Sequence, residues 1–204
     1  MKLSRVGIST LMLLTFCLVS GLSCAPAGAS RRLAPAPAGN PLPAGVLLLV
    51  PDDFNGFVYT STMGASQVRH YFGEHAVTDL DLMLRPRFRS LMTGHVPDEA
   101  AAKAMITSGA PFEGFDYVAI PRFDRVDSWN GNEKYGFEID IVLDLYAADG
   151  STITTIKGHG ESSAGVRAPA TPPGTGDMAL RMAVEAVRDG IDSRQNLFVP
   201  RTGG

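Results

Sequence analysis

Two histidines and a glutamate form the first pattern in this chain that could bind a metal. His70, Glu74 and His75 read H-x-x-x-E-H. A zinc-binding helix needs two imidazoles on one face, which a spacing of four residues provides. A spacing of five separates His70 and His75 by about 140° around a helix, and Gly73 between them disfavours a helix. The pattern predicts solvated or capping histidines, and we expect neither a metal site nor a cofactor.

A second pattern contains the residue types of a serine hydrolase. Ser162 and Ser163 lie in the sequence G-E-S-S-A-G, close to His159. The nucleophile elbow G-x-S-x-G is incomplete, because Ala164 occupies the place of the second glycine and a proline-rich loop follows instead of a helix. We therefore expect a polar strand end in a protein that is not an enzyme. A hydrolase that uses Ser162 or Ser163 with His159 is an alternative.

Three further patterns carry carboxylates or glycines. Asp52 and Asp53 follow a buried strand, where paired carboxylates could bind a cation, but a turn explains them equally well. Gly174-Thr175-Gly176 could present backbone amides to an anion, although an N-cap at Thr175 is the preferred interpretation. An acidic row on one strand face is expected to be solvated, or to dock a basic partner. Its members are Glu138, Asp140 and Asp144.

Two aromatic residues, Trp129 and Tyr135, flank the polar sequence Asn130-Gly131-Asn132. Aromatic side chains frequently anchor protein–protein interfaces. We therefore interpret Trp129 and Tyr135 as candidate contacts with a partner protein. The competing interpretation is that this loop packs back onto the sheet.

The N-terminal residues predict export. Lys2 and Arg5 precede an uncharged apolar run, Val6–Val19, and small residues lead from it to Cys24. A basic head, an apolar core too short to span a bilayer and a small-residue exit are typical of a signal peptide. The segment resembles a bacterial lipoprotein signal. This resemblance implies that Cys24 is lipidated, becomes the new N-terminus and anchors the protein to a membrane.

An ordinary secretory peptide, cut after Ala27 or Ala29, is the alternative and would give a soluble periplasmic protein. By resemblance, Ala25 after the cysteine implies transport to the outer membrane. Cys17 lies in the part that is removed, so lipidation of Cys24 would leave no free thiol. Removal of the signal lowers the formal net charge from -3 to -5. An acidic domain has no bulk attraction to nucleic acid, and we expect no such partner.

The elements that must position these residues lie in one predicted domain, residues 45–196. Residues 1–23 are the predicted signal peptide. The segment 24–44 is rich in alanine, proline and glycine, which predicts an extended tether. Residues 197–204 are predicted to be a loose tail.

Hydrophobic periodicity predicts the elements of this domain. Val46–Val50 is typical of a strand buried on both faces. Apolar residues at spacings of three and four predict helix over 66–92, interrupted at Gly73 and at Pro86, where we expect a kink or two consecutive helices. Alternation over Phe137–Leu145, followed by Asp149-Gly150, predicts a hairpin. The remaining expectations are a helix at 97–106, a strand at 115–126 with Pro121 at an edge or bulge, and a helix at 177–191.

This order predicts an α+β two-layer sandwich, with a mainly antiparallel sheet and helices packed on one face. The Pro-Asp-Asp-Phe ending of the first strand, Gly73–Phe88, Phe115–Pro121 and Ala179–Ile191 resemble exported lipoproteins with a domain similar to the N-terminal domain of TolB, CsgG, PelC and the YajG-type lipoproteins. The resemblance implies a non-enzymatic accessory protein of the envelope. Its partners would be export or assembly proteins, or further copies of itself. A periplasm-facing module that binds a lipid, glycan or peptide is the alternative.

Overall fold

The computed structural model describes residues 41–63, 66–108, 112, 114–131, 133–165 and 172–199. All of them belong to one unit of the chain, Arg32–Gly204. The strands are β1 (Leu42–Pro51), β2 (Tyr59–Met63), β3 (Ser66–His70), β4 (Phe88–Val96), β5 (Tyr117–Asn130), β6 (Lys134–Ala147) and β7 (Thr152–Gly165). The helices are α2 (Asp52–Asn55), α3 (Phe72–Leu84), α4 (Glu99–Thr107) and α5 (Pro172–Asp192), with 3-10 turns at η1 (Arg85–Arg87) and η2 (Gln195–Leu197).

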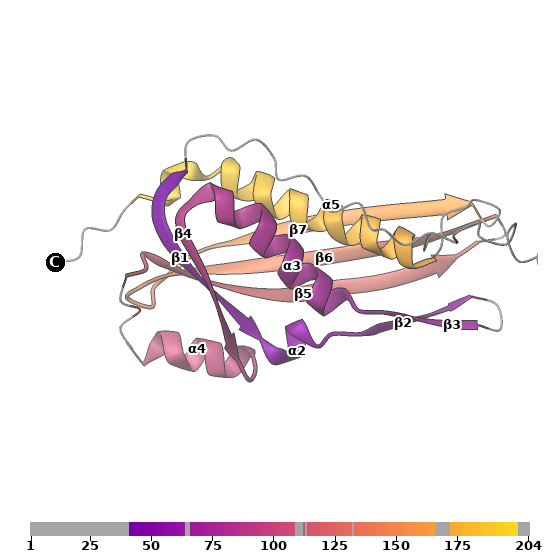
Figure 1. Cartoon of the computed structure of the whole chain (residues 1–204), viewed down its shortest axis with the longest axis horizontal. Helices are drawn as coiled ribbons and strands as arrows, with labels where there is room; N and C mark the ends of the chain where they lie inside the picture. The colour runs from indigo at the N-terminus through magenta and orange to yellow at the C-terminus, as the bar shows by residue number, and fades with distance from the viewer. Residues whose placement is uncertain are drawn as a thin grey trace, which may run out of the picture. The chain divides into compact units, whose positions relative to one another are not determined.

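Five strands form one mixed sheet in the order β4-β1-β5-β6-β7, and β2 and β3 form a separate antiparallel pair. β1 is parallel to β4 on one side and to β5 on the other. β5, β6 and β7 continue as a long antiparallel meander (Figure 1). The sequence-based prediction of an α+β fold is confirmed, and the antiparallel pairs account for most of the paired length of the sheet.

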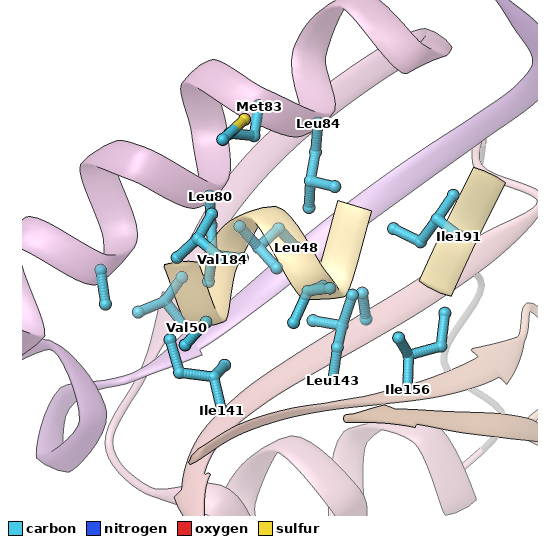
Figure 2. Close-up of a cluster of buried hydrophobic side chains, with 14 of the residues drawn as sticks. Leu48, Val50, Leu80, Met83, Leu84, Ile141, Leu143, Ile156, Val184 and Ile191 are labelled. Carbon is cyan, nitrogen blue, oxygen red and sulfur yellow. The ribbon is translucent and has the colours of Figure 1, made fainter. Parts of the chain in front are cut away.

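The larger core lies between one face of the sheet and the helices α3 and α5. Leu48 and Val50, which alternate along β1, contribute to it, and α3 and α5 supply Leu80, Leu84 and Val184 (Figure 2). All five side chains are buried. Full burial of such a side chain contributes about 1.5–3 kcal/mol, so this layer is the main source of stability.

Helix α4 covers the opposite face of the sheet. The intervening residues Leu49 of β1 and Val118 of β5 pack there against Ala102 and Ile106 of α4. The prediction that the helices pack on one face of the sheet therefore holds for α3 and α5, whereas α4 packs on the other face. The connection from β1 to β4 and the connection from β4 to β5 run in opposite directions along the sheet. Because parallel crossovers are right-handed, opposite directions place α3 and α4 on opposite faces.

The helix expected over 66–92 is shorter than predicted and has a strand at each end. β3 occupies its start, α3 its middle and β4 its end, with Pro86 in η1. Leu80 reaches the core from α3, whereas Phe88 and Leu91 reach the same core from β4. Phe88 and Leu91 are three residues apart, which is the spacing of one face of a helix and not the alternation of a strand. The spacing of apolar residues alone therefore predicted one helix where the structure has β3, α3 and β4.

The other two predicted helices are present, with shifted starts. Asp98 is the N-cap of α4, and its carboxylate accepts a hydrogen bond from the amide of Ala101 at 2.6 Å. This bond satisfies one of the free amides at the start of the helix. Helix α5 begins at Pro172 and not at Asp177, so Thr175 lies inside the helix and is not its N-cap.

The predicted hairpin is confirmed and is longer than expected. β6 and β7 pair along nearly their whole length. Gly150 in the connecting turn has a φ of 86°, a left-handed conformation that glycine adopts without steric cost. In β5, Pro121 lies beyond Ala119, the last residue that pairs with β1. Proline thus occupies an edge position, as predicted, because no strand there requires its missing amide proton.

The domain begins before residue 45. β1 starts at Leu42, so the last part of the predicted tether, 24–44, belongs to the sheet. The predicted signal peptide, 1–23, and the rest of the tether, including Cys24, lie outside the described residues. Among the residues that the structure describes, no helix combines the length and hydrophobicity that a membrane crossing requires.

The prediction of a loose tail from residue 197 onward is wrong for its first residues. Phe198 is 1% exposed, and the hydroxyl of Tyr117 lies 2.7 Å from the carbonyl oxygen of Leu197 and 2.8 Å from that of Val199. Leu197, Phe198 and Val199 are three consecutive apolar residues, and a run of this length shows neither a helix period nor a strand period. The burial of Phe198 therefore follows only from the pocket that the rest of the core forms around its ring.

Candidate functional site

The parallel part of the sheet changes its winding direction between β1 and β5. From β1 the chain crosses to β4, and from β4 it crosses back past β1 to β5. In open sheets with parallel strands, ligands bind in the crevice at the carboxyl ends of the strands, at such a switch point. Beyond Ala119, β5 no longer pairs with β1, and the crevice lies between the two strands from there on.

A groove of about 270 Å³ lies at this position. The end of β1, α2 with the segment after it, the first turn of α4 and the part of β5 that no longer pairs with β1 form its walls. It is lined by Pro51, Asp53, Phe54, Phe57, Glu99, Pro121, Arg122 and Phe123. Pockets that enclose a small molecule measure about 300–1,000 Å³. The groove therefore has room for a side chain with a short peptide segment.

Three phenylalanine rings form the apolar wall of the groove. The centroid of the Phe123 ring lies 4.6 Å from that of Phe54 and 4.8 Å from that of Phe57. Phe54 is buried, and the other two rings are partly exposed. Both separations lie at the short end of the range for interacting rings. Because the rings support one another, the wall exists before any ligand binds.

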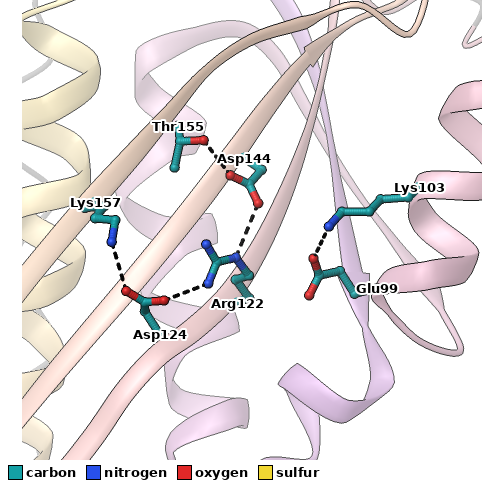
Figure 3. Close-up of polar contacts among 7 residues, drawn as sticks. All are labelled: Glu99, Lys103, Arg122, Asp124, Asp144, Thr155 and Lys157. Carbon is teal, nitrogen blue, oxygen red and sulfur yellow. Dashed lines mark hydrogen bonds and ion pairs between the residues drawn. The ribbon is translucent and has the colours of Figure 1, made fainter.

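Arg122 is the cation of the groove, and two carboxylates hold it in place. Its guanidinium lies 2.9 Å from Asp124 and 3.4 Å from Asp144 (Figure 3). Lys157 donates to the other oxygen of Asp124 at 2.9 Å, and Thr155 donates to Asp144 at 2.7 Å. The hydrogen bonds from Lys157 and Arg122 lower the pKa of Asp124. The charge of Arg122 is thus balanced within the protein.

The two carboxylates that line the groove differ in their partners. Glu99 pairs with Lys103, one turn further along α4 (Figure 3). Asp53 is exposed and accepts a hydrogen bond from the backbone amide of Phe54 at 2.9 Å. No cation among the described residues forms an ion pair with Asp53. Asp52, which precedes Asp53 in the chain, is exposed and does not line the groove.

The residues of the H-x-x-x-E-H pattern lie on two different elements. His70 ends β3 and is 3% exposed, and its Nε2 lies 2.8 Å from the hydroxyl of Ser61. His75 lies on α3, and its Nδ1 is 3.0 Å from the carboxylate of Asp177 on α5. Glu74 is exposed on α3. Strand and helix geometry therefore direct the two imidazoles to different partners.

His70 should make the stability of the domain depend on pH. Burial lowers the pKa of its imidazole, and the charge of Asp177 opposes this effect only in part. Below about pH 6.5 the His70 imidazole therefore becomes protonated in the unfolded chain while it is still neutral in the folded chain. Stability is fully present above that pH and falls as the pH drops toward the folded pKa, by at most about 1.4 kcal/mol per pH unit. Urea unfolding between pH 7.5 and 5 measures this slope.

In His70→Phe, which retains an aromatic ring beside Phe72 and Phe137, the slope should be shallower than in the wild type. The same change at the exposed His95 is the control and should leave the slope as it was, because solvent surrounds this imidazole in both states. Equal slopes in the wild type and His70→Phe would contradict the assignment.

His159 pairs with a carboxylate and not with a serine. Its Nδ1 lies 2.7 Å from Asp140, the residue opposite it on β6. Ser163 is four residues further along β7, about 13 Å away at 3.3 Å per residue. Ser162 points to the other face, because neighbouring strand residues alternate. A nucleophile and its base need a separation of about 2.6–3.2 Å, which the strand geometry does not provide here.

The predicted acidic row lies on the outer face of the sheet. Glu138, Asp140 and His159 place potential ligand atoms within 4.8 Å of one another, so this group could hold a cation. Arg125 already pairs with Glu138 at 2.7 Å. Asp144 pairs with the arginine of the groove at 3.4 Å. Arg122 and Arg125, both on β5, therefore neutralise part of the negative charge of this acidic row.

Trp129 and Tyr135 lie at the paired ends of β5 and β6 and not in a loop. Tyr135 is 4% exposed and lies 3.3 Å from the hydroxyl of Thr175, so the prediction that it contacts a partner is wrong. Trp129 is 39% exposed. Its ring covers Gly136, where a Cβ atom would lie 2.4 Å from Cζ2. The competing interpretation, that this segment packs back onto the sheet, describes both residues better.

Sequence reasoning named Asp53, together with Asp52, as a carboxylate that could bind a cation, and it missed the aromatic wall. Phe54 and Phe57 lie three residues apart in the short segment after β1. Large apolar residues in a connection are unusual, because connections run over the surface, and this signal could have indicated a site. Phe123 and Arg122 belong to a strand whose pattern is the same as that of any half-buried strand. They line a groove only because the pairing of β5 with β1 ends at Ala119, before these two residues.

Fold and groove together define an α+β domain with a mixed sheet and an open site at its switch point. No family model matches the chain, and no curated protein matches it. Among solved structures, a minor lipoprotein from Acinetobacter baumannii has 9% sequence identity and a TM-score of 0.44, over 78% of this chain and 96% of that one.

Lipoprotein GNA1162 from Neisseria meningitidis has 14% identity and a TM-score of 0.36, over 73% of this chain and 99% of that one. The hypothetical protein CT253 from Chlamydia trachomatis has 9% identity and a TM-score of 0.41, over 76% and 97%. Bacterial lipoproteins are thus among the similar structures. At TM-scores below 0.5 they do not assign this chain to a family.

Proposed function

We propose that this protein is a non-enzymatic accessory lipoprotein of the bacterial envelope that binds a partner protein through the groove. The observation that carries the proposal is the preformed aromatic wall of Phe54, Phe57 and Phe123 in an open groove. Aromatic residues in partly desolvated pockets supply much of the binding energy of protein–protein contacts. A hydrolase has less support, because His159 lies far from Ser163 and on the other face from Ser162.

A lipid on Cys24 would hold this domain at the outer membrane, facing the periplasm. Seventeen residues, 25–41, lie between Cys24 and Leu42, the start of β1. At about 3.3 Å per residue this segment reaches roughly 60 Å at most. An anchored domain could therefore meet partners well away from the membrane surface.

Lipidation is tested by labelling with a radioactive fatty acid. We expect incorporation into the wild-type chain and none into Cys24→Ala, because the cysteine thiol is the acceptor. Cys17→Ala is the matched control and should be labelled like the wild type, since Cys17 lies in the apolar core of the predicted signal. Equal labelling of wild type and Cys24→Ala would show that the protein is not a lipoprotein of this kind.

Partner binding is tested by photocrosslinking in native membranes. Benzoylphenylalanine at position 57, and separately at position 123, should give the same crosslinked protein, because both side chains line the groove. The control probe is placed at Met178, which is 50% exposed on α5, and should not give this product. The crosslinked protein is identified by mass spectrometry. Identical patterns from all three positions would contradict binding at the groove.

A further inference from the structure

The charges around the groove indicate the chemistry of its partner. The charged residues that line it, together with their ion-pair partners, are four carboxylates and three cations: Asp53, Glu99, Asp124 and Asp144, and Lys103, Arg122 and Lys157. All but one of them form ion pairs with one another. The set therefore has one negative charge in excess, and that charge resides on Asp53.

Asp53 lies beside the aromatic wall. Phe54 follows it in the chain, and Phe57 and Phe123 line the same groove. A lysine or arginine side chain satisfies both features, because its methylene groups pack on apolar surface while its charged end reaches a carboxylate. A cation near an aromatic ring gains further attraction from the ring. An anionic group would instead meet the carboxylate of Asp53, which has no cation among the described residues as its partner, and like charges at close range repel.

The backbone beside the groove favours a side chain that belongs to a polypeptide. Pairing between β1 and β5 ends at Ala119, so within the described part of the chain no strand pairs with β5 on its β1 side from Ile120 to Phe123. A free strand edge can bind the main chain of an extended peptide. Pro121 limits this edge to few hydrogen bonds, which suits a short segment.

We propose that the groove receives a lysine or arginine side chain from an extended segment of the partner protein, with Asp53 as the carboxylate that pairs with it. This proposal rests on the proposed function of the groove and adds the charge of the partner. The volume of about 270 Å³ accommodates one such side chain between the phenylalanine rings and the carboxylate.

The probe is the peptide acetyl-Leu-Lys-Leu-amide, titrated into the detergent-solubilised full chain and followed by ¹H–¹⁵N NMR. The matched peptide contains norleucine in place of lysine, which keeps an unbranched aliphatic chain and lacks the ammonium group. We expect shifts at Asp53, Phe57 and Phe123, and at least about fivefold tighter binding of the lysine peptide. Raising the salt concentration should weaken only the lysine peptide, because salt screens exposed charges.

Asp53→Asn removes the charge at an exposed position while keeping the size of the side chain. It should reduce the affinity for the lysine peptide about fivefold and leave the affinity for the norleucine peptide unchanged. Glu74→Gln, at an exposed carboxylate on α3, should change neither.

Equal affinity for both peptides, shifts outside the groove, or equal effects of Asp53→Asn and Glu74→Gln would each overturn the inference. If the crosslinking at positions 57 and 123 still captures one partner, only the charge of that partner is refuted. A crosslinked product of twice the chain's own mass would identify a second copy and would also overturn it, unless a lysine or arginine of that copy carries the crosslink.

Discussion

Replacing Gly160 by alanine is expected to lower the free energy of unfolding by about 3 kcal/mol. A Cβ atom at this position would lie 1.9 Å from the carbonyl oxygen of Ala179 and 2.5 Å from the amide nitrogen of Ala183. Both atoms belong to the backbone of α5, so no change of rotamer can relieve the contact. The helix would have to move away from β7. A Cβ atom added at Gly158 would likewise lie 2.0 Å from the carbonyl oxygen of Ala183.

Urea unfolding followed by circular dichroism measures this effect. The control is Gly165→Ala on the same strand, where the nearest atom to an added Cβ lies 3.7 Å away. Such a distance is ordinary van der Waals contact, and we expect a change within about 0.5 kcal/mol. If Gly160→Ala and Gly165→Ala unfold at the same urea concentration, α5 does not lie against β7 as described.

Phe198→Ala is expected to cost about 3 kcal/mol, or roughly 6–12 °C in melting temperature. The ring makes edge-to-face contacts with Phe88, at a centroid distance of 5.3 Å, and with Tyr117, at 5.5 Å. Its removal would leave a cavity in the larger core. It would also free the segment whose carbonyl groups bind the Tyr117 hydroxyl, so two adjacent interactions are lost together.

The control for Phe198→Ala is Val199→Ala, at a neighbouring side chain that is 58% exposed. Because solvent already surrounds this valine, the change should leave the melting temperature within about 2 °C of the wild type. Calorimetry of the wild type and the two variants provides the comparison. A wild-type melting temperature for Phe198→Ala would mean that residues 197–199 do not belong to the core.

Elements with a long and regular pattern could be predicted from the sequence. The alternation over Phe137–Leu145 with a glycine turn predicts the hairpin of β6 and β7, and five consecutive apolar residues predict β1. Elements with few core-facing residues could not be predicted in this way. β2, β3 and β4 have few core-facing residues each, and their assignment depends on contacts with distant parts of the chain. The strand β4, for example, is defined by its parallel pairing with β1.

The residues of the candidate site also divide into those that the sequence could predict and those that it could not. Asp53 could be identified because a carboxylate at the end of a buried strand is a recognisable pattern. Phe57 and Arg122 are 65 residues apart in the chain and share no motif. They line one groove because the chain crosses back over β1 on its way to β5. No local pattern encodes this crossing, since it follows from the packing of two helices on opposite faces.

By itself, the sequence determined the α+β class, the hairpin, the apolar sides of the helices and the expectation of a lipid anchor at Cys24. These properties depend on residues near one another in the chain, where periodicity and short motifs carry the information. The tertiary structure alone decided the groove, the separation of His159 from its serines, and the burial of Tyr135 and Phe198. Each of these depends on which distant residues meet, and therefore on the global packing that satisfies the core.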